Sequence, residues 1–141
     1  MTTPSNALQA AIYTRLTGYS TLTALVSTRI YDYIPESAVA PYVVIGDDTE
    51  IDWGNKSVNG WEVTITIHSW DYEKAGRKSV KTIQSAIYDA LNRNESNIII
   101  TGFTLVMIQS EFADTFQETS IDGQNDHFYH GVQRFRALIH A

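Results

Sequence analysis

Two histidines next to an aspartate, His127, His130 and Asp126, come closest in this sequence to a metal-binding set. Imidazole and carboxylate groups are common ligands of zinc and of other transition metals. The surrounding residues are typical of a strand, however, and side chains three positions apart on a strand point to opposite faces. The spacing therefore favours a structural or interfacial role for these histidines. The same holds for His68 and His140, which lie on predicted strands apart from this cluster, and we expect no metal and no cofactor.

Paired carboxylates can act as a general acid and base, and Asp47 and Asp48 form an adjacent pair. Their side chains diverge if a strand continues through them, so a solvated strand end is the favoured interpretation. The sequence contains no Gly-x-Ser-x-Gly elbow, no Gly-x-Gly-x-x-Gly or Walker-type phosphate loop, and no cysteine nucleophile. We therefore do not expect an enzyme.

The charges are unevenly distributed along the chain. Ten Lys and Arg against sixteen Asp and Glu give a formal net charge of -6. Every charged side chain between Arg29 and Lys56, and again between Arg93 and Arg134, is acidic. These stretches offer no cations for the phosphate contacts that dominate nucleic-acid affinity, so we expect them to repel DNA.

A basic run and one tryptophan suit contacts with other proteins. Arg77, Lys78 and Lys81 indicate a solvated helix face, or else a surface that pairs with an acidic neighbouring subunit. Trp53 stands in a polar segment that contains glycine. Such an aromatic side chain either folds back onto its own domain or is offered to a partner, and the sequence leaves both possibilities open.

Length and periodicity predict a single domain over residues 1–141 with elements in the order ααβββαββ. The predicted helices cover residues 4–17, 20–26 and 72–91. The predicted strands cover about 30–34, 42–46, 61–70, 98–116 with a kink at Gly102, and 127–140. Residues 47–60 are expected to form a long exposed loop, and residues 117–126 the tip of a projecting β-ribbon. No apolar run is long enough to cross a bilayer, and we expect neither a signal peptide nor membrane association.

This order of elements predicts an α+β fold, with an antiparallel (mixed) β-sheet and helices packed on one face. The strand 61–70 alternates between apolar and polar side chains, so one of its faces is expected to be buried. The other sheet face is too polar for a second core layer yet carries aromatic residues, which is typical of a subunit interface. Its polar members are Thr64, Thr66, His68, Arg134 and Arg136.

Short motifs follow one another in a distinctive order along nearly the whole chain. They are a first helix over 8–16 with Leu22, Leu25 and Val26; Arg29-Ile30-Tyr31-Asp32 with Pro35; Pro41 to Gly46; Trp53 with Lys56 and Gly60; Thr64 to Trp70 with His68; and His130-Gly131 with Arg134-Phe135-Arg136. In this order they resemble the tail-completion (tail-terminator) family of long-tailed phages and gene transfer agents.

The resemblance implies a structural virion protein, assembled in the host cytoplasm, that forms a homohexameric ring at the head-proximal end of the tail tube. Such a ring stops tube polymerisation and joins the tail to the head connector. The implied partners are further copies of the chain, the tail-tube protein and a head-completion or connector protein, while DNA passes through without specific binding. Residues expected at these contacts are Asp47, Asp48, Trp53, Lys56, Arg77, Lys78, Lys81, Asp122, Arg134 and Arg136.

Two alternatives remain open from the sequence. A head-tail adaptor or a tail-tube-like ring subunit shares the same small α+β design. A small hydrolase or ligand-binding domain would instead use Asp47, Asp48, His68 and His130. A deep pocket lined by these four residues would favour this second alternative, and a featureless groove would count against it.

Overall fold

The computed structural model describes residues 2–119 and 127–141. The helices are α1 (Ser5–Thr17), α2 (Ser20–Val26) and α3 (Gly76–Leu91), with 3₁₀ turns at Glu73–Ala75 and Glu95–Asn97. The strands are β1 (Ile30–Tyr31), β2 (Tyr42–Asp52), β3 (Gly60–Tyr72), β4 (Thr104–Thr119) and β5 (His127–His140). The order ααβββαββ is confirmed.

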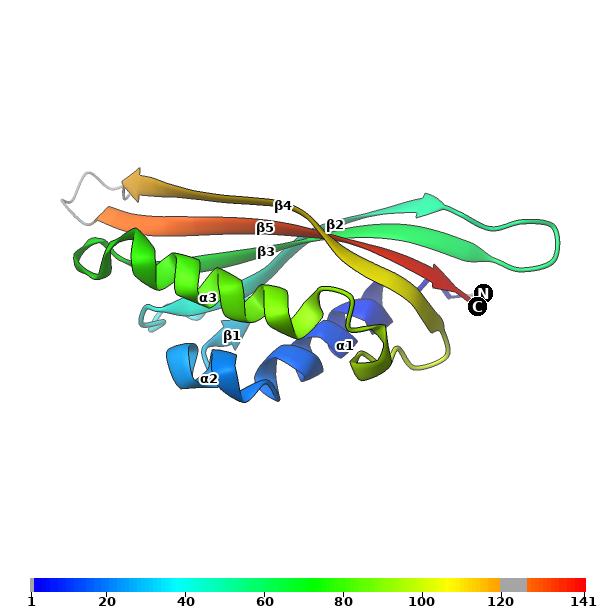
Figure 1. Ribbon diagram of the computed structural model, residues 1–141, viewed down its shortest axis with the longest axis horizontal. Coiled ribbons are helices and arrows are strands. Elements are labelled where there is room, and N and C mark those ends of the chain that lie inside the picture. Colours follow the sequence, from blue (N-terminus) through cyan, green and yellow to red (C-terminus); the bar gives the residue numbers. More distant parts are fainter. Residues whose placement is uncertain (1, 120–126) are drawn as a thin grey trace.

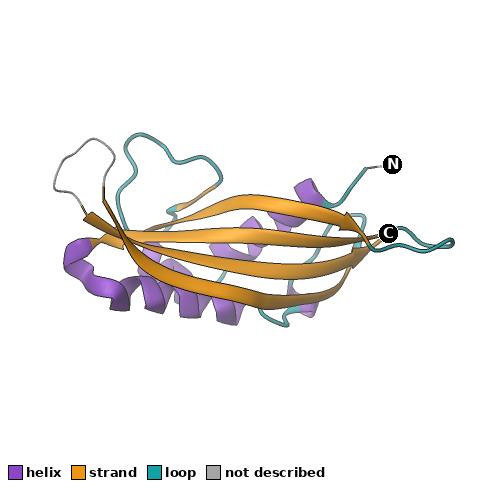
Figure 2. Ribbon diagram, turned by 90° about the horizontal axis from the view of Figure 1, so that it is seen from above, coloured by secondary structure: helices purple, strands orange, loops and turns teal. Residues whose placement is uncertain are grey.

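The strands form one sheet in the order β1-β2-β3-β5-β4. The short strand β1 runs parallel to β2, and the other neighbours pair antiparallel, so the sheet is mixed. Figure 1 shows the three helices on one side of this sheet, and in Figure 2 they lie behind it. The predicted α+β class, with helices on one face, is confirmed.

The core lies between the helices and the sheet. Helix α3 presents one apolar stripe to the sheet, which includes Ile83, Ile87 and Leu91. Opposite it, Ile65 on β3 and Phe135 on β5 face each other across the strand pair and are fully buried. Burying a side chain of this size contributes about 1.5–3 kcal/mol, so this layer is the main source of fold stability.

Polar contacts fix α3 against β4 and β5. The buried Gln84 side chain donates to the carbonyl of Asp114 at 2.9 Å and accepts from the Thr115 hydroxyl at 2.9 Å. Gln133 on β5 donates to the main-chain carbonyl of Gln84 at 2.9 Å. A Cβ at Gly131 would lie 2.6 Å from the Gln84 amide nitrogen, so this close approach requires glycine.

The predicted loop over 47–60 is too long, because β2 continues to Asp52 and only residues 53–59 connect it to β3. Residues 48–52 pair with 61–65 after a register shift between Ile45 and Asp48. The prediction failed because this half of β2 is solvent-exposed on both faces, so its side chains lack the apolar alternation that marks a half-buried strand.

The β-ribbon was also predicted inaccurately. Its first strand begins at Thr104 and not at residue 98, since Gly102 has a positive φ of 85° that ends the extended backbone before β4. The ribbon does not project from the sheet, because β5 pairs with β3 from Phe128 to His140. Residues 117–119 of the predicted tip belong to β4, while residues 120–126, including Asp122, lie outside the described residues.

Candidate interaction surface on the open sheet face

Side chains from five strands form a continuous row of rings across the face that the helices leave uncovered. Tyr42 lies opposite Trp70, and Trp70 and Phe116 both lie opposite His130, so antiparallel pairing places these four side chains on the same face. The ring centroids are 6.3 Å apart for Tyr42 and Trp70, 3.7 Å for Trp70 and His130, and 4.8 Å for Phe116 and His130. Tyr31 extends the row, with its centroid 6.1 Å from that of Tyr42. We call these five residues the aromatic row.

The aromatic row is partly exposed. His130 at its centre is buried beneath its neighbours, whereas Phe116 on the edge strand remains 37% exposed. Beside the row, Tyr72 and Phe128 form a further ring pair with centroids 5.6 Å apart. Exposed aromatic side chains that gather on a face without a covering layer are typical of protein interaction sites.

His68 and His130 meet at the inner side of the row. Nδ1 of His68 lies 2.7 Å from Nε2 of His130, so one ring donates and the other accepts. A Cβ at Gly46 would lie 2.8 Å from Cδ2 of His68, so glycine on β2 leaves room for this ring. The prediction that His68 stands alone is wrong, because His68 contacts His130. The contact depends on the β3–β5 register, which the sequence did not reveal.

Both imidazoles are kept neutral by their surroundings. Burial lowers the pKa of His68, and the carboxylates of Asp47 and Glu118 oppose this effect. Burial, followed by repulsion from His68, lowers the pKa of His130. The Glu118 carboxylate, which lies 3.1 Å from Nδ1 of His130, opposes this lowering. The pair therefore stays uncharged near neutral pH and adds polarity without charge to the face.

The two arginines predicted at contacts lie on the same face, but each has a partner within the chain. Nε of Arg134 lies 2.9 Å from the Glu111 carboxylate, and its guanidinium lies over the Phe112 ring at 5.1 Å. Nε of Arg136 lies 2.6 Å from the Glu62 carboxylate. These pairs neutralise charge along the open face, which leaves a polar but balanced surface around the aromatic row.

Trp53 and Lys56 lie on the connection between β2 and β3, at one end of the molecule (Figure 1). The Trp53 amide donates to the carbonyl of Gly60 at 2.8 Å, and a Cβ at Gly60 would lie 3.1 Å from the Trp53 ring. Trp53 is nevertheless 44% exposed. Its side chain therefore packs partly against its own hairpin and leaves the rest of its surface open to a partner. Lys56 is exposed at the tip.

Asp47 and Asp48 lie at the register shift in β2, and both are exposed. Together with Glu50 and Asp52 they form an acidic edge on the half of β2 that extends beyond β1, since β1 pairs only with Val43 and Val44. We refer to these four acidic residues as the acidic edge of β2.

The predicted basic residues occupy a separate place. Arg77, Lys78 and Lys81 are exposed on the first turns of α3, and the guanidinium of Arg77 lies over the Tyr129 ring at 4.9 Å. The predicted contact residues that the structure describes therefore fall into three regions: the end of the β2–β3 hairpin with the acidic edge, the start of α3, and the open sheet face. The sequence did not predict the aromatic row itself, although each member is an aromatic or histidine on a predicted strand or next to one.

The structure brings the residues of the hydrolase alternative together only in part. His68 contacts His130, but Asp48 lies opposite Ile65 on another stretch of the sheet. Within residues 2–119 and 127–141, no three His, Cys, Asp or Glu side chains are placed to share a metal ion. The helices in this part of the chain are too short or too polar to span a bilayer.

Comparison with known proteins shows which family this chain belongs to. The sequence model of the family described as tail completion protein gp17 matches residues 10–140. The chain therefore belongs to this family of phage tail structural proteins, which is not a class of enzymes.

A curated relative and a solved structure agree with the family match. The chain is 29% identical over 135 residues to the tail completion protein gp17 of Bacillus phage SPP1, covering 96% of this chain and 93% of the relative. It is also similar to a chain in the virion of a native gene transfer agent particle, with a TM-score of 0.83 and 25% identity over the whole length of both chains. The chain is thus a structural protein of the phage tail type.

Proposed function

We propose that this chain forms a ring at the head-proximal end of the phage tail tube, where it ends tube polymerisation and joins the tail to the head connector. The observation that carries the proposal is the open sheet face with its aromatic row. Tyr31, Tyr42 and Trp70 in this row are half-buried and Phe116 is exposed. Isolated domains seldom leave a connected group of aromatic side chains in contact with solvent, whereas subunit interfaces are enriched in them. A second copy of the chain is the proposed cover for this face.

A closed ring also needs two dissimilar surfaces on each copy, because head-to-tail contacts join one patch to a different one. The chain provides oppositely charged surfaces in the basic start of α3 and the acidic edge of β2. Charge attraction between such surfaces orients neighbouring copies during assembly. Six copies are proposed from the family resemblance.

The acidic stretches suit a ring through which DNA moves. The net charge of -6 and the acidic edge of β2 repel phosphates, so DNA passes without binding. The β2–β3 hairpin with Trp53 and Lys56 is proposed to contact the tail tube or the connector. The segment around Asp122 is proposed to do the same, although it lies outside the described residues.

Particles assembled without this protein test the proposal. We expect tails of uncontrolled length that fail to join heads, and normal particles when the wild-type chain is supplied in trans. Tails of native length that remain unjoined would favour the head-tail adaptor alternative. Joined tails of native length in the absence of the chain would contradict both functions.

A further inference from the structure

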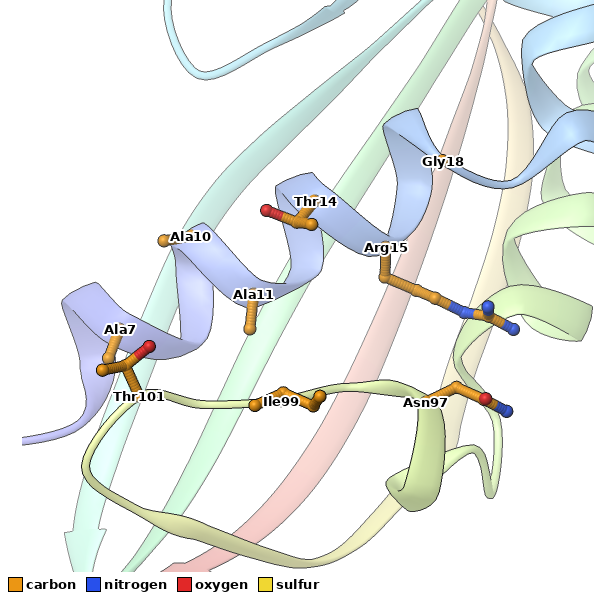
Figure 3. A pocket seen from close by; sticks show the side chains of 9 residues that line it. All are labelled: Ala7, Ala10, Ala11, Thr14, Arg15, Gly18, Asn97, Ile99 and Thr101. Atoms are coloured by element: carbon orange, nitrogen blue, oxygen red, sulfur yellow. The ribbon is translucent and has the colours of Figure 1, made fainter.

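A groove on the helical side of the molecule separates α1 from the segment 97–101, which leads into β4. Figure 3 shows Ala11 facing Ile99 across this groove, with Arg15 and Asn97 at one end. The groove has a volume of about 520 Å³. Ile99 on its rim is 82% exposed, an unusual position for a large aliphatic side chain. The groove is therefore a recess with an apolar rim that the chain itself leaves open.

Helix α1 lacks the charged outer face of an ordinary surface helix. Arg15 is its one charged residue, and its Nε is engaged with the carbonyl of Ala90 at 2.8 Å. The outward positions next to the groove include Ala10, Tyr13 and Thr14, which are exposed and uncharged. Depletion of charge is the compositional mark of the centre of a protein interface.

The loop between β1 and β2 provides a matching projection. Tyr33 in this loop is 84% exposed, and Ile34 and Val39 beside it are exposed as well. Tyrosine offers a large contact area at a low cost in side-chain entropy, and it is enriched among the residues that dominate binding. The loop therefore presents an apolar projection, and the α1 groove presents a recess.

The loop and the α1 groove are complementary in charge and lie at different places on the chain. The charged residues of the loop, Asp32 and Glu36, are both acidic, whereas Arg15 is the charged residue among those that line the groove. The loop follows β1 at one edge of the sheet, and segment 97–101 leads into β4 at the opposite edge. Ala10 and Thr14 of α1 lie between them, because they line both the groove and a second recess that Asp32 borders. A contact between them thus joins dissimilar patches of two copies, which is the geometry that closes a ring.

We propose that the loop over 32–39 of one copy inserts Tyr33 into the α1 groove of the next copy. The occupant of the groove is a second copy of this chain. This inference rests on the proposed ring and names one of its subunit contacts.

Cysteine cross-linking in assembled particles tests the contact, because the natural chain contains no cysteine. The double variant Tyr33→Cys with Ile99→Cys should give a ladder of covalent multimers on non-reducing gels after mild oxidation. Each single-cysteine variant should give no ladder. The matched pair Tyr88→Cys with Ile99→Cys, which uses an exposed tyrosine on α3, should give none either.

A substitution series supplies the second measurement. Tyr33→Ser, and Ala11→Trp, which fills the groove, should each reduce incorporation into particles at least tenfold, whereas Tyr88→Ser should leave incorporation unchanged. A thermal melt of each purified chain separates loss of assembly from loss of folding. Because Ala11 is largely buried, Tyr33→Ser is the decisive variant if Ala11→Trp unfolds the chain.

The outcomes separate this contact from the proposed ring. Rings of normal size that give no ladder, together with normal incorporation of Tyr33→Ser, would overturn the contact and leave the ring intact. The absence of rings from wild-type particles would overturn the proposed function and the contact with it. A ladder that depends on both cysteines supports the contact directly.

Discussion

Alternate residues of β3 point to the two faces of the sheet, and the two sets have different roles. Val63, Ile65 and Ile67 point to the helices and are at most 1% exposed. Thr66 and His68, their neighbours in sequence, point to the open face and are only half-buried. The first set stabilises the fold, while the second set belongs to the surface proposed to meet another copy. The comparison predicts that stability and assembly can be changed separately along a single strand.

The strongest test of the covered face is Ile65→Ala. The Ile65 side chain is fully buried opposite Phe135, so its truncation leaves a cavity, and we expect a loss of about 2–5 kcal/mol in the free energy of unfolding. Urea denaturation of the purified chain measures this loss. Thr66→Ala, one residue along the strand, is the control and should cost about 0.5 kcal/mol. Equal losses for the two variants would contradict the division between the faces.

Phe116→Ser tests the open face. This side chain is 37% exposed on the edge strand, so we expect a stability loss of only about 1 kcal/mol. Incorporation into particles should nevertheless fall sharply, since the variant removes one end of the aromatic row. Electron microscopy and quantitative gels of purified particles measure incorporation. Normal incorporation, with Tyr88→Ser as the matched aromatic control, would exclude the row as an interface.

The histidine pair predicts a pH dependence of stability. The pKa values of His68 and His130 are lowered in the folded chain, so the unfolded chain binds more protons once the pH falls below about 6.5. Their contribution is therefore complete above that pH and is lost as the pH falls from 6.5 toward the lowered values. Urea midpoints measured between pH 7.5 and 5.5 should decline in the wild-type chain.

A double substitution isolates the histidine pair from other titrating groups. The variant His68→Gln with His130→Gln keeps His127 and His140, so its urea midpoint should decline less over the same pH range. Parallel declines in the two chains would show that other groups cause the effect.

The smallest expected effect concerns the Arg136–Glu62 pair on the open face. Both side chains are partly exposed, so a double-mutant cycle with Arg136→Met and Glu62→Gln should give a coupling of less than about 1 kcal/mol. Raising the salt concentration should reduce it further. A coupling of several kcal/mol would mean that the pair is shielded from water, which would contradict the contrast between the open face and the buried face of the sheet.

Residue patterns were sufficient for most of the fold but for little of the surface. The apolar alternation of Val63, Ile65 and Ile67 and the helical stripe containing Ile83 and Ile87 predicted β3 and α3, because each pattern reports burial on one side. The pattern failed where β2 runs through solvent beyond Gly46, since a strand exposed on both faces has no alternation to detect. It also placed the start of β4 too early.

The sequence by itself determined the order of the elements, the buried faces and the acidic charge, since each depends on residue types and on local spacing. Only the tertiary structure brought Tyr42, Trp70, His130 and Phe116 into one row and placed His68 against His130. The physical reason is that these contacts depend on strand order and register across sequence separations of up to 62 residues. A shift of one residue in that register would send each strand's side chains to the opposite face.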